Sequence, residues 1–151
     1  MKRGTILLAE DNRRLRRLYT DSLRLQGYDV HDFETGESLL AQVGATSPDL
    51  VVLDISMPGV GGIEVCRRAR HSLNPHIPVL ILTGFEDPEL VEQAFAAGAD
   101  DFIVKSGTLD SILERVDIWI ERSGIANLSA LRSQVLNKLK NRRVHNAVGS
   151  A

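Results

Sequence analysis

Hydrophobic residues in this chain form short apolar runs that alternate with stretches of helical spacing. Five runs predict β-strands, at residues 5–9, 28–33, 50–53, 79–83 and 101–104. Apolar residues at three- and four-residue steps predict helices that begin near Asn12, Gly36, Ile63, Pro88 and Thr108. Glycines and prolines stand where these elements should end. The pattern therefore predicts strand followed by helix, five times over.

This alternation with short connections is typical of an α/β fold, with a parallel five-stranded sheet covered by helices on both faces. The runs at 5–9, 50–53 and 79–82 are apolar without alternation, which predicts central strands. We expect one domain over residues 1–123 and a helical linker or tail over 124–151. Gly124 should end the fifth helix, and an apolar spacing of three or four residues then continues through Leu128, Leu131, Val135 and Leu139.

Composition narrows the class of protein. The 151 residues are 43% hydrophobic and 25% charged with a net charge of -2, which suits an ordinary globular domain and gives no general affinity for nucleic acid or acidic membrane. The single cysteine, Cys66, is expected in the core, and it fits a reducing compartment. No apolar stretch is long enough to span a membrane, so a cytoplasmic location is predicted. The arginine run, Arg13 to Arg17, is interpreted as a solvated face.

Polar residues stand where the predicted strands end. In a parallel sheet these positions share one edge, which is where open α/β sheets bind ligands. We therefore expect three carboxylates, a hydroxyl and an ammonium to meet there, from Glu10 and Asp11, Asp54, Thr83 and Lys105.

Neighbouring carboxylates raise one another's pKa unless a cation lies between them. Oxygen ligands with room for water and phosphate favour Mg²⁺. Asp54 ends the third strand beside a glycine-rich loop, so it is the predicted nucleophile toward a phosphoryl group. Lys105 and Thr83 would then hold the phosphoryl oxygens.

Each residue has an ordinary interpretation when taken alone. Asp11 could cap the first helix, Asp54 could be a turn residue, and Lys105 could be a solvated charge. The combination favours a functional site because residues of the required types stand at the same end of several strands.

The motifs resemble the receiver domain of two-component response regulators. They are the pair Glu10-Asp11, the segment DISMPGVGG that begins at Asp54, Thr83-Gly84, AAGADDF that ends at Phe102, and Lys105. The resemblance covers Lys2 to about Arg122 and implies a flavodoxin-like (βα)5 fold with a sheet of order 2-1-3-4-5. It implies that Asp54 accepts a phosphoryl group from a histidine kinase or histidine phosphotransfer protein, and that the acyl phosphate later hydrolyses.

The resemblance also implies a set of metal ligands. Asp11, Asp54 and the backbone carbonyl of Ser56 would hold Mg²⁺, and Glu10 would act through water.

The same resemblance assigns the phosphate contacts and the switch. Lys105, Thr83 and the amide of Gly84 would bind the phosphoryl oxygens. Movement of Thr83 toward the phosphate would let Phe102 turn inward, which would reshape the face formed by the fourth helix, the fifth strand and the fifth helix.

The chain departs from the family pattern at two positions. Ser106 follows Lys105 where the family usually has a cis-proline, so we expect the cost of a cis bond to favour a trans peptide here. Gly84 stands where alanine is common, which predicts a looser loop.

These features predict a signalling domain rather than an enzyme, one that catalyses only its own phosphorylation and dephosphorylation. Its partners would be the phosphodonor and a downstream protein or an output domain absent from this sequence, and a homodimer is left open. A receiver-like adaptor that acts without phosphorylation is one alternative. A Mg²⁺-dependent phosphatase of the haloacid dehalogenase kind is another, but Ser56 stands where such enzymes need a second aspartate. Flavin or nucleotide binding is opposed by the charge of Glu10 and Asp11.

Overall fold

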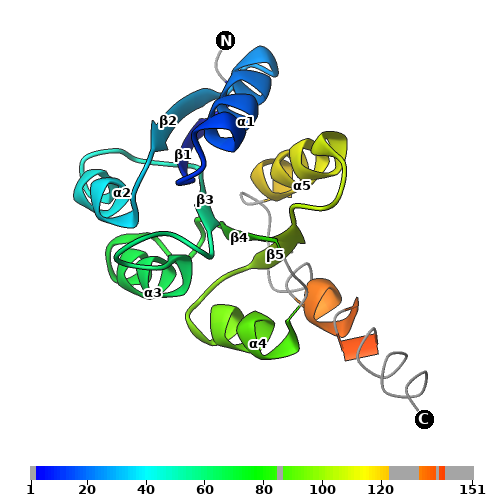
Figure 1. Cartoon of the computed structure of the whole chain (residues 1–151). Coiled ribbons are helices and arrows are strands. Elements are labelled where there is room, and N and C mark those ends of the chain that lie inside the picture. The colour runs from blue at the N-terminus through cyan, green and yellow to red at the C-terminus, as the bar shows by residue number, and fades with distance from the viewer. Residues whose placement is uncertain (1–2, 85–86, 123–132, 139, 142–151) are drawn as a thin grey trace.

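The computed structural model describes residues 3–84, 87–122, 133–138 and 140–141. Strands and helices alternate along the chain (Figure 1). The strands are β1 (Thr5–Ala9), β2 (Asp29–Phe33), β3 (Leu50–Asp54), β4 (Val79–Thr83) and β5 (Asp101–Val104). The helices are α1 (Arg13–Leu25), α2 (Gly36–Val43), α3 (Gly62–Ser72), α4 (Pro88–Ala96) and α5 (Leu109–Arg122). Within the described residues, no helix is both long enough and apolar enough to cross a membrane.

The five strands form one parallel sheet in the order β2-β1-β3-β4-β5. Helices α1 and α5 cover one face, and α2, α3 and α4 cover the other (Figure 1). The predicted fold class and strand order are therefore confirmed. The central strands β3 and β4 are buried along their whole length, as their unbroken apolar sequence predicted.

Each face of the sheet has its own hydrophobic core. The core under α1 and α5 includes Leu8, Leu23, Val52, Leu82 and Val116. The core under α2, α3 and α4 includes Leu39, Leu53, Val65, Ile81 and Ala94, together with the predicted core residue Cys66. Alternate residues of one strand enter opposite cores because side chains alternate across a sheet.

The helix starts follow the local sequence. The side chain of Asn12 accepts a hydrogen bond from the backbone N–H of Leu15 and caps α1. Asp87 caps α4 in the same way through the N–H of Glu89, with Pro88 at the first turn, as predicted. Gly27 follows α1 with a φ of 97°, a conformation that favours glycine.

Helix α5 buries an aromatic side chain beside its aliphatic stripe. By helical spacing Trp119 lies at the margin of this stripe, and in the structure it is 1% exposed and belongs to the core. Its indole Nε1–H donates to Oδ2 of the fully buried Asp101, 2.9 Å away. Arg115 donates to the same carboxylate through Nε and Nη2, at 2.8 and 2.7 Å. Because the hydrogen bond to Asp101 satisfies the indole N–H, Trp119 can be buried. The buried face of α5 is therefore wider than its aliphatic residues alone indicate.

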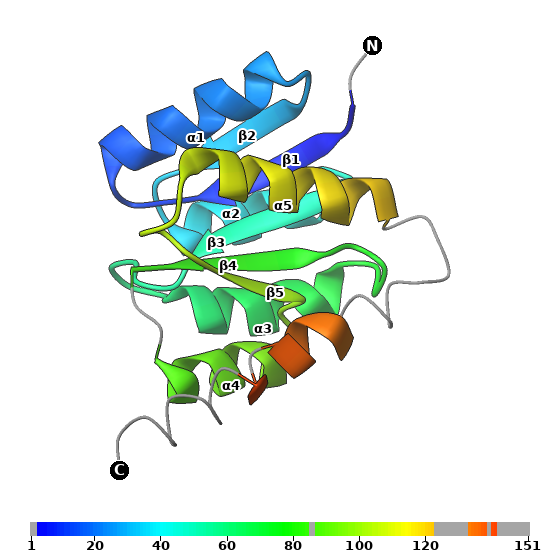
Figure 2. The ribbon, with the colours of Figure 1, turned by 90° about the vertical axis from the view of Figure 1, so that its right-hand side faces the viewer.

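Beyond α5, residues 133–138 and 140–141 are helical, so the predicted C-terminal helical extension is present. This segment, here called the C-terminal helix, lies beside β5 and α4 in both views (Figures 1 and 2). Val135 joins the core under α1 and α5. The predicted domain boundary at residues 123 and 124 and the apolar positions Leu128, Leu131 and Leu139 lie outside the described residues.

Candidate functional site

The sheet brings the predicted site residues to one edge. Asp54 and Thr83 are the last residues of β3 and β4, and Lys105 directly follows β5. Glu10 and Asp11 follow β1. Because β1, β3, β4 and β5 are consecutive and parallel in the sheet, these five residues end up at the same edge.

Three carboxylates form an acidic cluster at this edge. Carboxylate oxygens of Glu10, Asp11 and Asp54 all lie within 4.8 Å of one another. Glu10 is fully buried and Asp54 is 3% exposed, whereas Asp11 is half-buried. Two carboxylates in such a buried position need a compensating positive charge.

Lys105 supplies part of this charge. Its Nζ donates to Oε1 of Glu10 at 3.0 Å, lies 2.8 Å from Oε2 of the same carboxylate, and lies 3.1 Å from Oδ2 of Asp54. Burial alone would lower the pKa of Lys105, but the hydrogen bond and charge of Glu10, with those of Asp54, outweigh it and raise the pKa. Lys105 is therefore a protonated bridge between β1 and β3.

One ammonium does not balance three carboxylates. Burial raises the pKa of Asp54 to about 7, with further contributions from the Glu10 charge and a hydrogen bond to Asp11, while Lys105 acts in the opposite direction. The site thus holds more negative charge than its own cation neutralises. A divalent cation would remove this imbalance.

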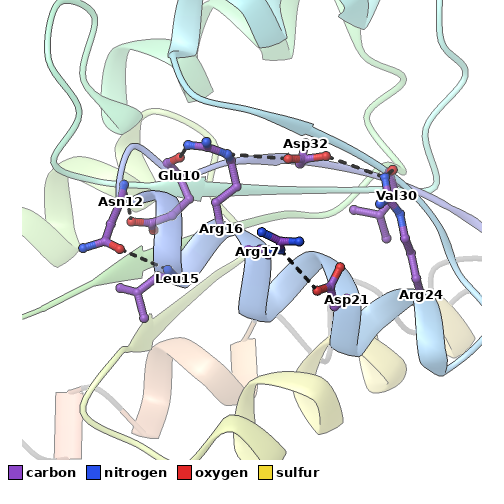
Figure 3. Close-up of polar contacts among 9 residues, drawn as sticks. All are labelled: Glu10, Asn12, Leu15, Arg16, Arg17, Asp21, Arg24, Val30 and Asp32. Carbon is purple, nitrogen blue, oxygen red and sulfur yellow. Dashed lines mark hydrogen bonds and ion pairs between the residues drawn. The ribbon is translucent and has the colours of Figure 1, made fainter.

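Glu10 is fixed in place by its neighbours. The backbone N–H of Asn12 donates to Oε1 of Glu10 at 3.3 Å, and Arg16 Nη1 donates to the backbone carbonyl of Glu10 at 2.9 Å (Figure 3). Arg16 also lies 3.5 Å from Asp32 of β2. The prediction that the whole arginine run is solvated is therefore wrong for Arg16. Its side chain contacts the carbonyl of Glu10, which follows β1, and the carboxylate of Asp32 on β2.

The possibility that Asp11 serves as a helix cap is not realised. Asn12 occupies the cap position of α1 and uses its own side chain for that purpose. The Asp11 carboxylate lies instead within the acidic cluster. Asp11 is the most exposed residue of the three, since Glu10 and Asp54 are almost completely buried.

The loop after β3 explains why glycines follow Asp54. A Cβ on Gly62 would lie 2.2 Å from the carbonyl oxygen of Asp54, a contact that no side chain allows. Glycine therefore lets the start of α3 pack directly against the end of β3. In the same loop, the backbone N–H of Ser56 donates to Oδ1 of Asp54 at 3.2 Å, and the Ser56 residue is exposed. Oδ1 and Oδ2 of Asp54 thus have different partners, a backbone amide and Lys105.

The predicted phosphate and switch residues lie on or next to β4 and β5, which follow β3 in the sheet. They are Thr83, Gly84 and Phe102. Thr83 is fully buried and pairs with Val104 in the register of β4 and β5, while Gly84 is exposed. Phe102 is 5% exposed and packs in the core under α2, α3 and α4. Phe102 therefore already lies inside the domain in this structure, and its predicted role in the switch remains a prediction.

No peptide bond in the described residues is cis, so the bond between Lys105 and Ser106 is trans, as the absence of proline predicted. The backbone N–H of Lys105 still donates to the carbonyl of Thr83 at 2.7 Å. This bond continues the pairing of β4 and β5 up to the lysine, so a trans loop is sufficient to place the ammonium at the site.

The donor set fits magnesium. All candidate ligands are oxygens, they come from three carboxylates and the exposed loop after Asp54, and they carry more negative charge than Lys105 balances. Mg²⁺ prefers such ligands and keeps part of its water shell, which the accessible Asp11 side of the cluster allows. In the described residues, no other group of three histidine, cysteine or acidic side chains has this spacing.

The chain is similar in sequence to known proteins. The family model for the response regulator receiver domain matches residues 6–117. Response regulator MprA of Mycolicibacterium vanbaalenii is 35% identical over 118 residues, which are 78% of this chain and 51% of that protein. The CAI-1 autoinducer sensor kinase/phosphatase CqsS of Vibrio cholerae is 35% identical over 117 residues, 76% of this chain and 17% of that protein. The chain thus spans about half of one relative and a smaller part of the other.

Solved structures show the same fold. A response regulator receiver domain protein (CheY-like) from Methanospirillum hungatei is 26% identical, with a TM-score of 0.74 over 80% of this chain and 95% of that chain. The TM-score shows that the two folds are similar. By its sequence, its fold and the acidic edge of its sheet, this chain belongs to the response regulator receiver domain family of two-component systems.

Proposed function

We propose that this chain is a phosphorylation-dependent signalling switch, and that Asp54 accepts the phosphoryl group. The observation that carries the proposal is the position of Asp54, whose Oδ2 lies 3.1 Å from Lys105 Nζ within a cluster of three carboxylates. A carboxylate beside an ammonium and a candidate metal site has what phosphoryl transfer needs, namely a nucleophile and positive charge around the transferred group.

The donor is a phosphohistidine on a histidine kinase or a histidine phosphotransfer protein. An Asp54 oxygen attacks phosphorus, the phosphorus–nitrogen bond breaks, and its electron pair stays on the imidazole, which takes up a proton. Water later attacks the acyl phosphate and releases inorganic phosphate and the carboxylate. The domain is therefore a signalling domain that catalyses only its own phosphorylation and dephosphorylation.

Asp11, Asp54 and the backbone carbonyl of Ser56 would hold Mg²⁺, with Glu10 acting through water. The bound ion would supply positive charge for the phosphoryl oxygens. Glu10 is the most deeply buried acid of the cluster and is already paired with Lys105, so its role is to fix the position of the ammonium.

Phosphoryl oxygens would be bound by Lys105, the hydroxyl of Thr83 and the amide of Gly84. When Lys105 moves toward the new charge, Asp54 and Glu10 lose part of their present partner. Thr83 then passes the change to β5 through its pairing with Val104 and to the Phe102 side chain. The contacts made by α4, β5 and α5 with downstream proteins would change as a result.

The domain would act in the cytoplasm, and residues 1–123 would form the receiver, followed by a linker or tail over 124–151. Relatives in which the aligned region is only half of the protein, such as MprA, suggest that the signal passes to further domains or partner proteins. The net charge of -2 does not favour nucleic acid as a direct partner of this domain.

The proposal is tested by incubating the chain with Mg²⁺ and acetyl phosphate and measuring the intact mass. The expected result is one phosphoryl group, labile in hydroxylamine, that requires Mg²⁺ and is absent from Asp54→Asn. The matched control is Asp110→Asn, which changes an exposed aspartate in the first turn of α5. Equal uptake by Asp54→Asn, or no uptake by the unchanged chain, would reject the proposal. No uptake together with unchanged partner binding would favour the adaptor.

A further inference from the structure

The C-terminal helix covers an edge of the sheet that would otherwise be open. Among the strands that the structure describes, β5 pairs only with β4, and its other side is the end of the sheet. Figures 1 and 2 show residues 133–138 beside β5 and α4, next to this edge. Proteins commonly cover such an edge with a helix, since unpaired strands are open to other partners.

Among residues 133–138 and 140–141, the buried side chain of this helix is Val135. Val135 is 9% exposed and belongs to the same core as Ile103 of β5 and Trp119 of α5. The neighbouring Gln134 and Asn137 are exposed, and Leu136 is 36% exposed. Phe95 of α4 packs against both cores, which places it where the two faces of the sheet meet at this edge. In the described part of the helix the buried contact is one apolar side chain, which is suited to reversible docking.

Charge complementarity supports the same placement. Helix α4 and its cap expose Asp87, Glu89 and Glu92, and α4 contains no basic residue. The described part of the C-terminal helix exposes Lys138 and Lys140 and contains no acidic residue. Opposite charges on adjacent elements favour the docked arrangement over release into solvent, most strongly at low salt.

The covered edge is connected to the candidate phosphorylation site. Thr83 ends β4 at the site and pairs with Val104 of β5, while Ile81 pairs with Phe102. Helix α4 follows Thr83 after a short loop, with its cap at Asp87. A change at Thr83 therefore acts directly on the strand and the helix against which the C-terminal helix lies.

We propose that the C-terminal helix is a built-in competitor for the α4–β5 edge, docked through Val135 in the resting chain and released when Asp54 is phosphorylated. This inference rests on the proposed function for its trigger, but the docking itself does not. A ligand that binds only one of two states shifts the balance between them, and the coupling is reciprocal. Docking should therefore oppose phosphorylation, and phosphorylation should weaken docking.

The first experiment measures thiol reactivity in the full chain. Val135→Cys places a thiol at the buried anchor, Asn137→Cys places one at an exposed position of the same helix, and the native Cys66 is buried in both. In the resting state, the thiol introduced by Val135→Cys should react with a disulfide reagent at least about tenfold more slowly than that of Asn137→Cys. After addition of Mg²⁺ and acetyl phosphate, the two rates should become similar. The acceleration should be absent when Asp54→Asn is added to Val135→Cys.

The outcomes separate the two proposals. Equal resting rates would overturn docking, whatever happens at Asp54. Protection that persists in chains shown by mass to be phosphorylated would overturn release while leaving the proposed function intact. No phosphoryl uptake would overturn the proposed function and the trigger together, while protection of the resting thiol would still establish the docked helix.

Reciprocity gives a second experiment. Val135→Asp should undock the helix because it places a charge in an apolar contact, whereas Asn137→Asp adds the same charge at an exposed position. The Val135→Asp chain should take up phosphoryl groups from acetyl phosphate about two- to tenfold faster than Asn137→Asp, as expected for ordinary coupling between sites. Equal rates in two folded variants would contradict an inhibitory role for the helix.

Discussion

The ammonium of Lys105 lies 3.1 Å from Oδ2 of Asp54, and it joins a residue that follows β5 to the last residue of β3. Strand β4 lies between these two strands in the sheet. The ion pair therefore spans the carboxyl edge of the sheet. The same ammonium also pairs with Glu10, which follows β1. The same contact stabilises buried negative charge and prepares the edge for an anion, so stability and function are coupled at this site.

Replacing Lys105 should destabilise the fold in a pH-dependent manner. Lys105→Met leaves Glu10 and Asp54 buried without their cation, and breaking a buried pair costs about 3–5 kcal/mol in free energy of unfolding. Lys105 lowers the pKa of Asp54, so its removal raises that pKa further and lets the carboxylates take up protons in mild acid. Denaturant unfolding in EDTA should therefore show the larger loss at about pH 8 and a smaller loss at about pH 5.5.

Mg²⁺ should recover part of the stability lost in Lys105→Met, because the ion supplies positive charge to the same carboxylates. A loss that is the same at both pH values would show that the lysine contributes packing alone.

Asp54→Asn should stabilise the chain when no divalent ion is present. The pKa of Asp54 is raised to about 7 by burial and by Glu10, so the protonated form is favoured in the folded state. Its contribution to stability is present below the ordinary aspartate pKa and is lost as the pH rises through about 7. The neutral asparagine removes this loss. Thermal unfolding at about pH 8 in EDTA should give a higher midpoint for the variant, by about 2–4 °C for each kcal/mol.

With saturating Mg²⁺ the difference in unfolding midpoint between the variant and the unchanged chain should become smaller or change sign, because the unchanged chain binds the ion more tightly. A variant that melts below the unchanged chain at about pH 8 in EDTA would contradict the view that the resting cluster is electrostatically strained.

Most of the fold followed from local pattern. The bounds of β1, β4 and β5 agree with the sequence predictions residue for residue, because apolar runs and glycine or proline stops encode them locally. The site residues Asp54 and Lys105 were also placed together by sequence, since a parallel sheet brings strand ends to one edge whatever their distance along the chain. Their roles in phosphoryl transfer remain predictions.

Other features depend on tertiary partners that no local pattern reveals. Arg16 has the same sequence environment as its solvated neighbours, and only the fold brings Glu10 and Asp32 to it. Trp119 is buried where its indole N–H donates a hydrogen bond to Asp101. One signal was available, because a charged residue at the start of an apolar strand such as β5 needs a buried partner, and Arg115 lies on the following helix.

The close contact between α3 and β3 predicts that Gly62→Ala is disruptive. The new Cβ would lie 2.2 Å from the Asp54 carbonyl oxygen, so the backbone that carries Asp54 must move. We expect a loss of about 1–3 kcal/mol in chemical denaturation and slower phosphoryl uptake. Gly44→Ala is the matched control, because nothing lies within 4 Å of its Cβ position and its φ is -77°. That change should be neutral or stabilising by up to about 1 kcal/mol. Similar effects at both glycines would refute the steric explanation.

The buried Asp101 predicts a strong effect at Arg115. Arg115→Met removes two hydrogen bonds from a carboxylate that keeps only Trp119 and the N–H of Phe102. The expected loss is about 2–4 kcal/mol in free energy of unfolding. Adding Asp101→Asn should recover part of it, since the uncompensated charge is gone.

The control for this prediction is Arg67→Met, which breaks an exposed pair with Glu64 on α3 and should cost no more than about 0.5 kcal/mol. If Arg115→Met is as mild as the control, Asp101 is not held as the ion pair indicates.

The chemical identity of the phosphorylated residue is the most direct test of the central claim. The chain is phosphorylated with acetyl phosphate and Mg²⁺, reduced with borohydride, which converts an aspartyl phosphate to homoserine, and mapped by peptide mass spectrometry. The account predicts the modification at Asp54 alone. Modification at Glu10 or Asp11 with Asp54 unchanged would contradict it.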